Sequence, residues 1–140
     1  MFENAGIKSV IARATHVDTE KKAKKIVFIG AGFINLELAS LPSTVRADYY
    51  NVTIVELLGH PLPLMLDAEM GFKIQKYLVG KGFNMLIGHK VTKIIGSNGY
   101  VSGVELETGE KIDADIVMLS VGTTPKPGHL SLFSIRRLNG

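Results

Sequence analysis

Two glycines one residue apart, Gly30 and Gly32, form the part of this 140-residue sequence best suited to chemistry. They follow a continuous apolar run typical of a buried strand and precede a segment with helical spacing. Gly30 permits a tight turn, and Gly32 lacks the Cβ that would keep a pyrophosphate away from the backbone. A helix that begins near Phe33 would point free N–H groups and its positive dipole end at this turn. The pattern predicts an anion site built from main-chain geometry.

Asn35 stands where the usual dinucleotide fingerprint, G-x-G-x-x-G, has its third glycine. That glycine lets the helix lie close to the strand, so a side chain there should push the helix away or rearrange the turn locally. The amide of Asn35 could also add a hydrogen bond near the phosphates. The sequence leaves both outcomes open.

Glu56 is an acidic residue placed where it could complete a dinucleotide site together with the glycine turn. It lies 26 residues beyond Gly30, at the carboxyl end of the second predicted strand. A carboxylate in that place can accept both hydroxyls of an adenosine ribose, and its charge would repel a ribose 2′-phosphate. An acid at a strand end can also be a solvated surface group, but the order of strand, glycine turn, helix and strand favours ribose binding. We therefore expect NAD(H) as cofactor in preference to NADP(H).

The elements around the turn alternate in the order β-α-β-α-β and then change character. Apolar runs predict strands, a first helix follows the turn and is expected to be interrupted at Pro42, and a second helix begins at the N-cap Asp67. The predicted strands span 26–29, 51–56, 83–87, 91–95, 100–106, 111–112 and 115–121. The fold class is therefore α/β: a Rossmann-type three-layer domain with a central parallel sheet and an antiparallel three-stranded β-meander. We divide the chain into a lead-in segment 1–24, a domain 25–127 and a tail 128–140.

The composition excludes several classes of function. Without cysteine the chain has no disulfide, thiolate metal site or thiol redox step of its own. The net charge of +3 is scattered, which argues against nucleic-acid binding, and the four histidines lack ligand spacing, which argues against a metal site. No apolar stretch is long enough to span a membrane and no signal peptide pattern is present, so we expect a soluble, cytoplasmic protein.

Four ordered blocks, covering about residues 24–127, carry a resemblance to a known family. They comprise residues 25–39, 52–56, 62–70 and 112–125. The chain resembles the NAD-binding domain of the FAD-dependent pyridine nucleotide-disulfide oxidoreductases, in particular the NADH oxidase, coenzyme A disulfide reductase and ferredoxin reductase branch. In such flavoproteins this domain is inserted within an FAD domain, and hydride passes from the nicotinamide to the flavin.

The resemblance implies a role for individual residues of this chain. It places the pyrophosphate on Gly30, Gly32 and the amides of Phe33 and Ile34, the adenosine ribose on Glu56, the adenine beside Val91 and the nicotinamide end beside Gly122. Glu37 matches a helix acid near the nicotinamide that usually pairs with a basic residue of the FAD domain. Without that partner, Glu37 could equally be an ordinary polar residue of the helix.

The sequence contains no FAD-binding segment, so the resemblance implies an NAD(H)-binding domain that orients the nicotinamide but is inactive by itself. FAD would belong only to the full-length protein. The expected partner is the FAD domain of the parent chain, or a second copy of this chain on the face that the FAD domain would cover. Two other functions remain open: an S-adenosylmethionine methyltransferase-like domain, which also uses a glycine turn and a strand-end acid, and a non-catalytic Rossmann scaffold.

Overall fold

A computed structural model describes residues 23–46 and 50–121 of the chain, and within them strands and helices follow one another closely. The elements are β1 (Lys25–Ile29), α1 (Phe33–Arg46), β2 (Asn51–Glu56), α2 (Ala68–Gly80), β3 (Asn84–Ile87), β4 (Val91–Ser97), β5 (Tyr100–Leu106), β6 (Lys111–Asp113) and β7 (Ile116–Leu119).

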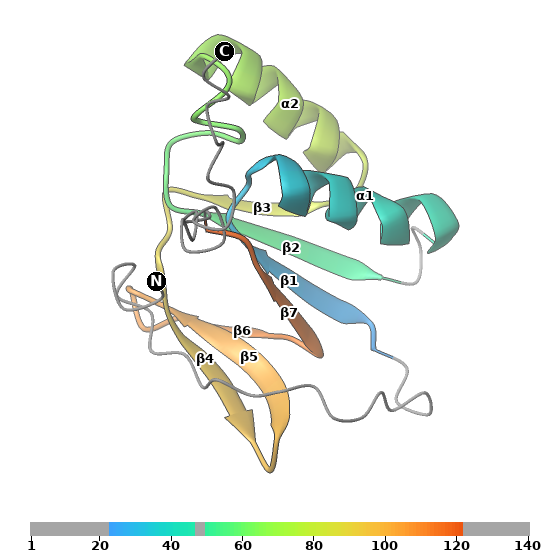
Figure 1. The fold of residues 1–140 in the computed structure, drawn as a ribbon, viewed down its shortest axis with the longest axis vertical. Helices are drawn as coiled ribbons and strands as arrows, with labels where there is room; N and C mark the ends of the chain where they lie inside the picture. The colour runs from blue at the N-terminus through green and yellow to red at the C-terminus, as the bar shows by residue number, and fades with distance from the viewer. Residues whose placement is uncertain (1–22, 47–49, 122–140) are drawn as a thin grey trace, which may run out of the picture.

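The described elements form three layers. β1, β2, β3 and β7 make a parallel sheet in the order β3-β2-β1-β7, and β4, β5 and β6 make a separate antiparallel sheet. In Figure 1 both helices lie on one face of the parallel sheet and the antiparallel sheet lies on the other. The predicted α/β class, with its parallel sheet and β-meander, is confirmed.

The two faces of the parallel sheet explain why β1 is apolar from residue 26 to residue 29 and why β2 is mostly apolar. Val27, Ile29 and Val55 pack against the meander, whereas alternate residues such as Phe28 and Ile54 pack toward the helices. Successive side chains of a strand point to opposite faces, so a strand that is covered on both sides is apolar at most positions. The buried Thr53 of β2 is an exception. This two-sided burial holds the carboxyl ends of β1 and β2 in a fixed position.

The predicted start of α2 is confirmed, whereas the predicted interruption of α1 is not observed. The Asp67 side chain caps α2, accepting a hydrogen bond from the Met70 amide at 2.9 Å, as predicted. The expected interruption at Pro42 is wrong, because α1 continues through this residue to Arg46. A proline removes one main-chain hydrogen bond and strains the preceding turn, but it does not by itself end a helix.

The predicted antiparallel meander is present with its two turns. Asn98 and Gly99 adopt positive φ values of 53° and 81° between β4 and β5, and Gly109 has φ 85° before β6. The strand expected at 115–121 is shorter and ends at Leu119. The tail, nearly all of the lead-in segment and the residues that follow Val121 lie outside the described residues.

Asp115 ties the start of β7 to the start of β1. Its Oδ2 accepts the main-chain N–H groups of Lys24 and Lys25, both at 2.8 Å, and the Asp115 N–H donates to the Lys25 carbonyl at 2.8 Å. The hydrogen bonds from Lys25 and then Lys24 lower the pKa of Asp115 below its ordinary value of 3.8. These bonds therefore stabilise the fold while the carboxylate is ionised.

Replacing Asp115 with alanine is expected to lower stability by less than about 1 kcal/mol, because the carboxylate is exposed to solvent. A lowered folded-state pKa contributes stability that is present above the ordinary pKa and is lost as the pH falls through the folded-state value. The difference in free energy of unfolding between the wild type and Asp115→Ala should thus be constant near neutral pH and become smaller below about pH 4. Urea unfolding at a series of pH values measures it. A difference that becomes larger in acid would contradict this account, and Glu107→Ala, at an exposed turn, is the control.

Candidate functional site

The turn after β1 has the backbone conformation that its first glycine predicted. Gly30 has φ +96°, and a Cβ added there would lie 2.6 Å from the Ser120 carbonyl oxygen. The Gly30 N–H donates to the Val55 carbonyl of β2 at 2.7 Å, and the Ser120 N–H donates to the Ile29 carbonyl at 3.2 Å. The turn is thus held between β2 and the residue after β7, and only glycine fits its first position.

The second glycine borders open space. A Cβ added at Gly32 would meet no atom within 4 Å, so the approach to this backbone is unobstructed by the described residues. α1 begins at the next residue, Phe33, and the Leu36 N–H bonds back to the Gly32 carbonyl at 3.1 Å. The N–H groups before Leu36 have no earlier helical carbonyl to bond. The first turn of α1 itself holds no acidic residue, so no side chain of that turn neutralises the positive end of the helix.

Glu56 lies against the glycine turn. Its side chain is 7% exposed; Oε2 accepts the Ala31 N–H at 2.5 Å, and Oε1 accepts the Leu58 N–H at 2.8 Å. Each carboxylate oxygen has a second lone pair, so both can still accept a hydroxyl hydrogen. The structure therefore brings the acid from the end of β2 and the backbone of the turn together at one edge of the sheet.

Asn35 is buried beneath the turn, with 1% of its surface exposed. Its Nδ2 donates to the carbonyls of Ile29 and Gly30, both at 2.8 Å. The side chain therefore forms hydrogen bonds with the end of β1 and with the turn, where the fingerprint glycine would have no side chain. Its two donated hydrogen bonds go to main-chain carbonyls, so they are not directed at a phosphate.

The other predicted contact residues are more scattered. Phe33 and Ile34 begin α1 with side chains 59% and 53% exposed, and Glu37 lies exposed further along the same helix. Val91, at the start of β4, is 3% exposed and packs in the core between the two sheets, which leaves its main chain as the part able to border an adenine. Gly122 lies outside the described residues. The cofactor contacts of these residues stay predictions.

The segment after β2 also borders the turn, which the sequence reading did not anticipate. The Leu62 N–H donates to the Ala31 carbonyl at 2.9 Å, Leu62 has a positive φ of 54°, and Pro61 is fully buried. The His89 N–H donates to the Glu56 carbonyl at 3.0 Å, which attaches the connection between β3 and β4 to the same edge. The apolar block beginning at Leu62 was the available signal, but spacing alone does not reveal a main-chain contact.

Apolar side chains surround this edge on two segments. Besides Phe33 and Ile34, the segment after β2 exposes Leu58 by 47%, Leu64 by 94% and Met65 by 66%. Exposed apolar groups on this scale are typical of a surface that another domain or chain covers. The identity of that covering partner stays a prediction.

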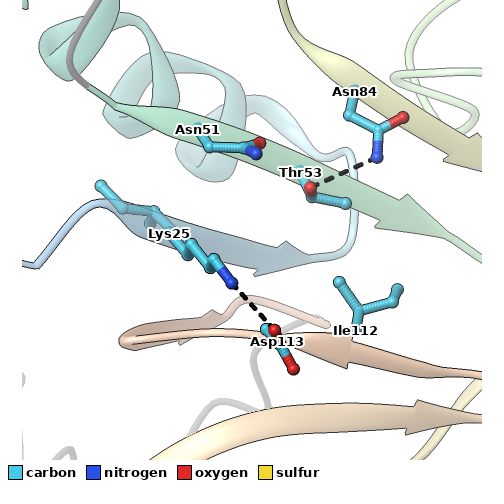
Figure 2. A pocket seen from close by; sticks show the side chains of 7 residues that line it. Lys25, Asn51, Thr53, Asn84, Ile112 and Asp113 are labelled. Atoms are coloured by element: carbon cyan, nitrogen blue, oxygen red, sulfur yellow. Dashed lines mark hydrogen bonds and ion pairs between the residues drawn. The ribbon is translucent and has the colours of Figure 1, made fainter.

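A small polar hollow lies at the opposite ends of the strands (Figure 2). Its volume is about 180 Å³, and it is bordered by the first residues of β1, β2 and β3. The Lys25 Nζ lies 2.8 Å from Asp113, which raises the pKa of Lys25, and the Asn84 amide donates to the Thr53 hydroxyl at 3.4 Å. Ligands of parallel α/β sheets bind beyond the carboxyl ends of the strands, and this hollow is too small for a dinucleotide. We interpret it as the junction between the two sheets.

Within residues 23–46 and 50–121, no three histidine or acidic side chains come together as a group able to hold a metal ion. Neither described helix is long and apolar enough to cross a membrane.

Together, the fold and this edge define a three-layer α/β domain with a glycine turn and a strand-end acid. The sequence profile of the pyridine nucleotide-disulphide oxidoreductase family matches residues 2–134. The mitochondrial dihydrolipoyl dehydrogenase of Caenorhabditis elegans is 33% identical over 136 residues, which cover 92% of this chain and 26% of the relative. The ferredoxin reductase of Rhodopseudomonas palustris superposes with a TM-score of 0.70 at 32% identity, covering 78% of this chain and 26% of that one. The water-forming NADH oxidase of Lactobacillus brevis, solved bound to NADH, gives 0.67 at 26% identity, covering 79% and 24%.

The chain belongs to the pyridine nucleotide-disulphide oxidoreductase family. It spans about a quarter of the length of the relatives it matches. Members of this family use FAD and NAD(H).

Proposed function

We propose that this chain is the NAD(H)-binding domain of a flavin-dependent pyridine nucleotide oxidoreductase. It orients the nicotinamide for hydride transfer to FAD that is held outside this chain. The observation that carries the proposal is the contact of the buried Glu56 carboxylate with the Ala31 amide inside the glycine turn. In a dinucleotide site of this kind, the turn after the first strand holds the pyrophosphate and the acid at the end of the next strand holds the ribose of the same ligand.

The residues of this edge divide the work of holding the cofactor. The backbone at Gly32 and the first N–H groups of α1 would hold the pyrophosphate, because that side of the turn is open and no acid lies in the first turn of the helix. Glu56 would accept the ribose hydroxyls with the lone pairs that the backbone amides do not use. The bound NADH would supply the hydride, and the chain would hold the nicotinamide ring in the orientation needed for its transfer.

The apolar rim formed by Phe33, Ile34, Leu64 and Met65 fits the second half of the proposal. Hydride transfer to a flavin requires that water be kept from the reacting rings and that a second domain close on this edge. We therefore assign the rim to the FAD domain of the parent protein, with a second copy of the chain as the alternative partner when that domain is absent.

Calorimetric titration of the folded chain with NADH and then NADPH tests the proposal. We expect saturable binding of NADH and at least about tenfold weaker binding of NADPH, because Glu56, the proposed ribose ligand, carries a negative charge that would repel a 2′-phosphate. ADP-ribose, which lacks the nicotinamide, should also bind and serves as the control for the adenosine half. Absence of NADH binding at millimolar ligand by a folded protein, or a preference for NADPH, would overturn the proposal.

A further inference from the structure

Asn35 links the end of β1, the glycine turn and the first turn of α1 by side-chain hydrogen bonds. It belongs to the first turn of α1, and its carboxamide bonds the last residue of β1 and the first residue of the turn. Both partners are carbonyl oxygens, so only the NH₂ end of the amide can satisfy them, which fixes the orientation of the side chain. The amide thus uses both N–H groups to fasten the start of the helix to the end of the strand.

Asn35 stands where the dinucleotide fingerprint has a glycine. A glycine at this position lets a helix pack closely on the strand, but it offers no side-chain donor to the Ile29 and Gly30 carbonyls. In this chain the Ile29 carbonyl accepts from Asn35 and from the Ser120 N–H, and the Gly30 carbonyl accepts from Asn35. The turn is held by β2 on one side, by the residue after β7 on another, and by Asn35 from below.

We propose that the Asn35 carboxamide is the positioning group of the nucleotide site, holding the N–H groups of Gly32, Phe33 and Ile34 in the direction of the pyrophosphate. The inference rests on the proposed function. Asn35 does not touch the ligand; it acts through the turn, because any change at its two carbonyl partners tilts the start of α1 relative to β1. An amide donor at residue 35 is then a requirement for tight dinucleotide binding in this chain.

Replacing Asn35 with aspartate isolates the amide donors, because the two side chains have the same shape. An ionised carboxylate would face two carbonyl oxygens in a site that is 1% exposed, so burial and these oxygens raise the pKa of the new acid. Glu56, at the end of β2, bonds the Ala31 amide of the same turn, and Glu37 lies exposed on α1; both are present in every variant. We expect Asn35→Asp to bind NAD⁺ about tenfold more weakly than the wild type at pH 8, and to recover part of that loss at pH 5.5, because a protonated carboxyl restores one of the two donated hydrogen bonds.

The control is Asn84→Asp, which adds the same charge at the amino end of β3, far along the strands from the turn, and should follow the wild type at both pH values. Equal NAD⁺ affinity of Asn35→Asp and wild type at pH 8 would overturn the inference while leaving the proposed function intact. A wild type that binds no dinucleotide overturns both. Should Asn35→Asp be unfolded at pH 8, Asn35→Ala carries the test: about tenfold weaker binding at both pH values supports the inference, and unchanged binding overturns it.

Discussion

Replacing Glu56 with glutamine is expected to lower the stability of the chain by about 2 kcal/mol and to weaken NADH binding at least tenfold, to roughly the level of NADPH. Both carboxylate oxygens accept main-chain N–H groups, from Ala31 and Leu58, in a site that is 7% exposed. Glutamine keeps the shape but offers one oxygen and one NH₂ group, so one of the two amides would face another donor. The ribose hydroxyls would lose the charge that binds them, and the 2′-phosphate would lose the charge that repels it.

The two readouts separate a structural acid from a ribose-binding acid. Urea unfolding measures the first, and calorimetric affinities for NADH and NADPH measure the second. An acid that only stabilised the turn would, when replaced, weaken both nucleotides by the same factor. The matched control is Glu107→Gln, which removes the same charge at an exposed position in the turn after β5 and should leave both measurements unchanged. A variant that kept the wild-type preference for NADH would contradict the assigned role of Glu56.

Gly30→Ala is expected to lower the stability of the chain, whereas Gly32→Ala is expected to lower its affinity for nucleotide, although both substitutions add the same methyl group. At Gly30 the methyl would lie 2.6 Å from the Ser120 carbonyl oxygen, on a residue with φ +96°, so we expect a loss of about 3 kcal/mol in stability. That is a large share of the roughly 5–15 kcal/mol that holds a typical domain together. At Gly32 the methyl meets no atom within 4 Å, so stability should change by less than about 1 kcal/mol.

At Gly32 the added methyl should lower nucleotide affinity and not stability. The methyl would occupy the space through which the pyrophosphate approaches the backbone, so Gly32→Ala should stay folded and bind NADH at least about tenfold more weakly. Each variant is the control for the other, with thermal unfolding and titration measured on both. Wild-type affinity in a folded Gly32→Ala protein would show that the phosphates do not lie against this residue.

Much of the fold could be predicted because its elements carry strong local signals. The apolar residues of β1 and β2 reflect burial on both faces, and Asp67 marks the start of α2 by its capping geometry. The turn at Asn98 and Gly99 gives the antiparallel pairing of β4 and β5. Pro42 misled the prediction because α1 tolerates the loss of one main-chain hydrogen bond, which no local pattern reveals.

The site was predictable in its residue types but not in its contacts. Spacing placed Gly30 and Glu56 at the ends of neighbouring parallel strands, where they meet. The role of Asn35 depends on the two carbonyl groups that its amide reaches beneath the turn. The contact of the segment after β2 with the turn depends on the hydrogen bond from the Leu62 N–H to the Ala31 carbonyl, across about 30 residues of sequence. Such tertiary contacts follow from packing, so composition and periodicity do not contain them.

The most direct test of nucleotide binding at this turn is an amide ¹H–¹⁵N correlation spectrum of the folded chain recorded during titration with NADH. We expect saturable shifts of the Gly32, Phe33 and Ile34 signals together with that of Glu56, and none at Asn51 or Asn84, at the opposite ends of the strands. Saturable shifts confined to the amino ends of the strands, or a spectrum unchanged at millimolar NADH, would contradict the account.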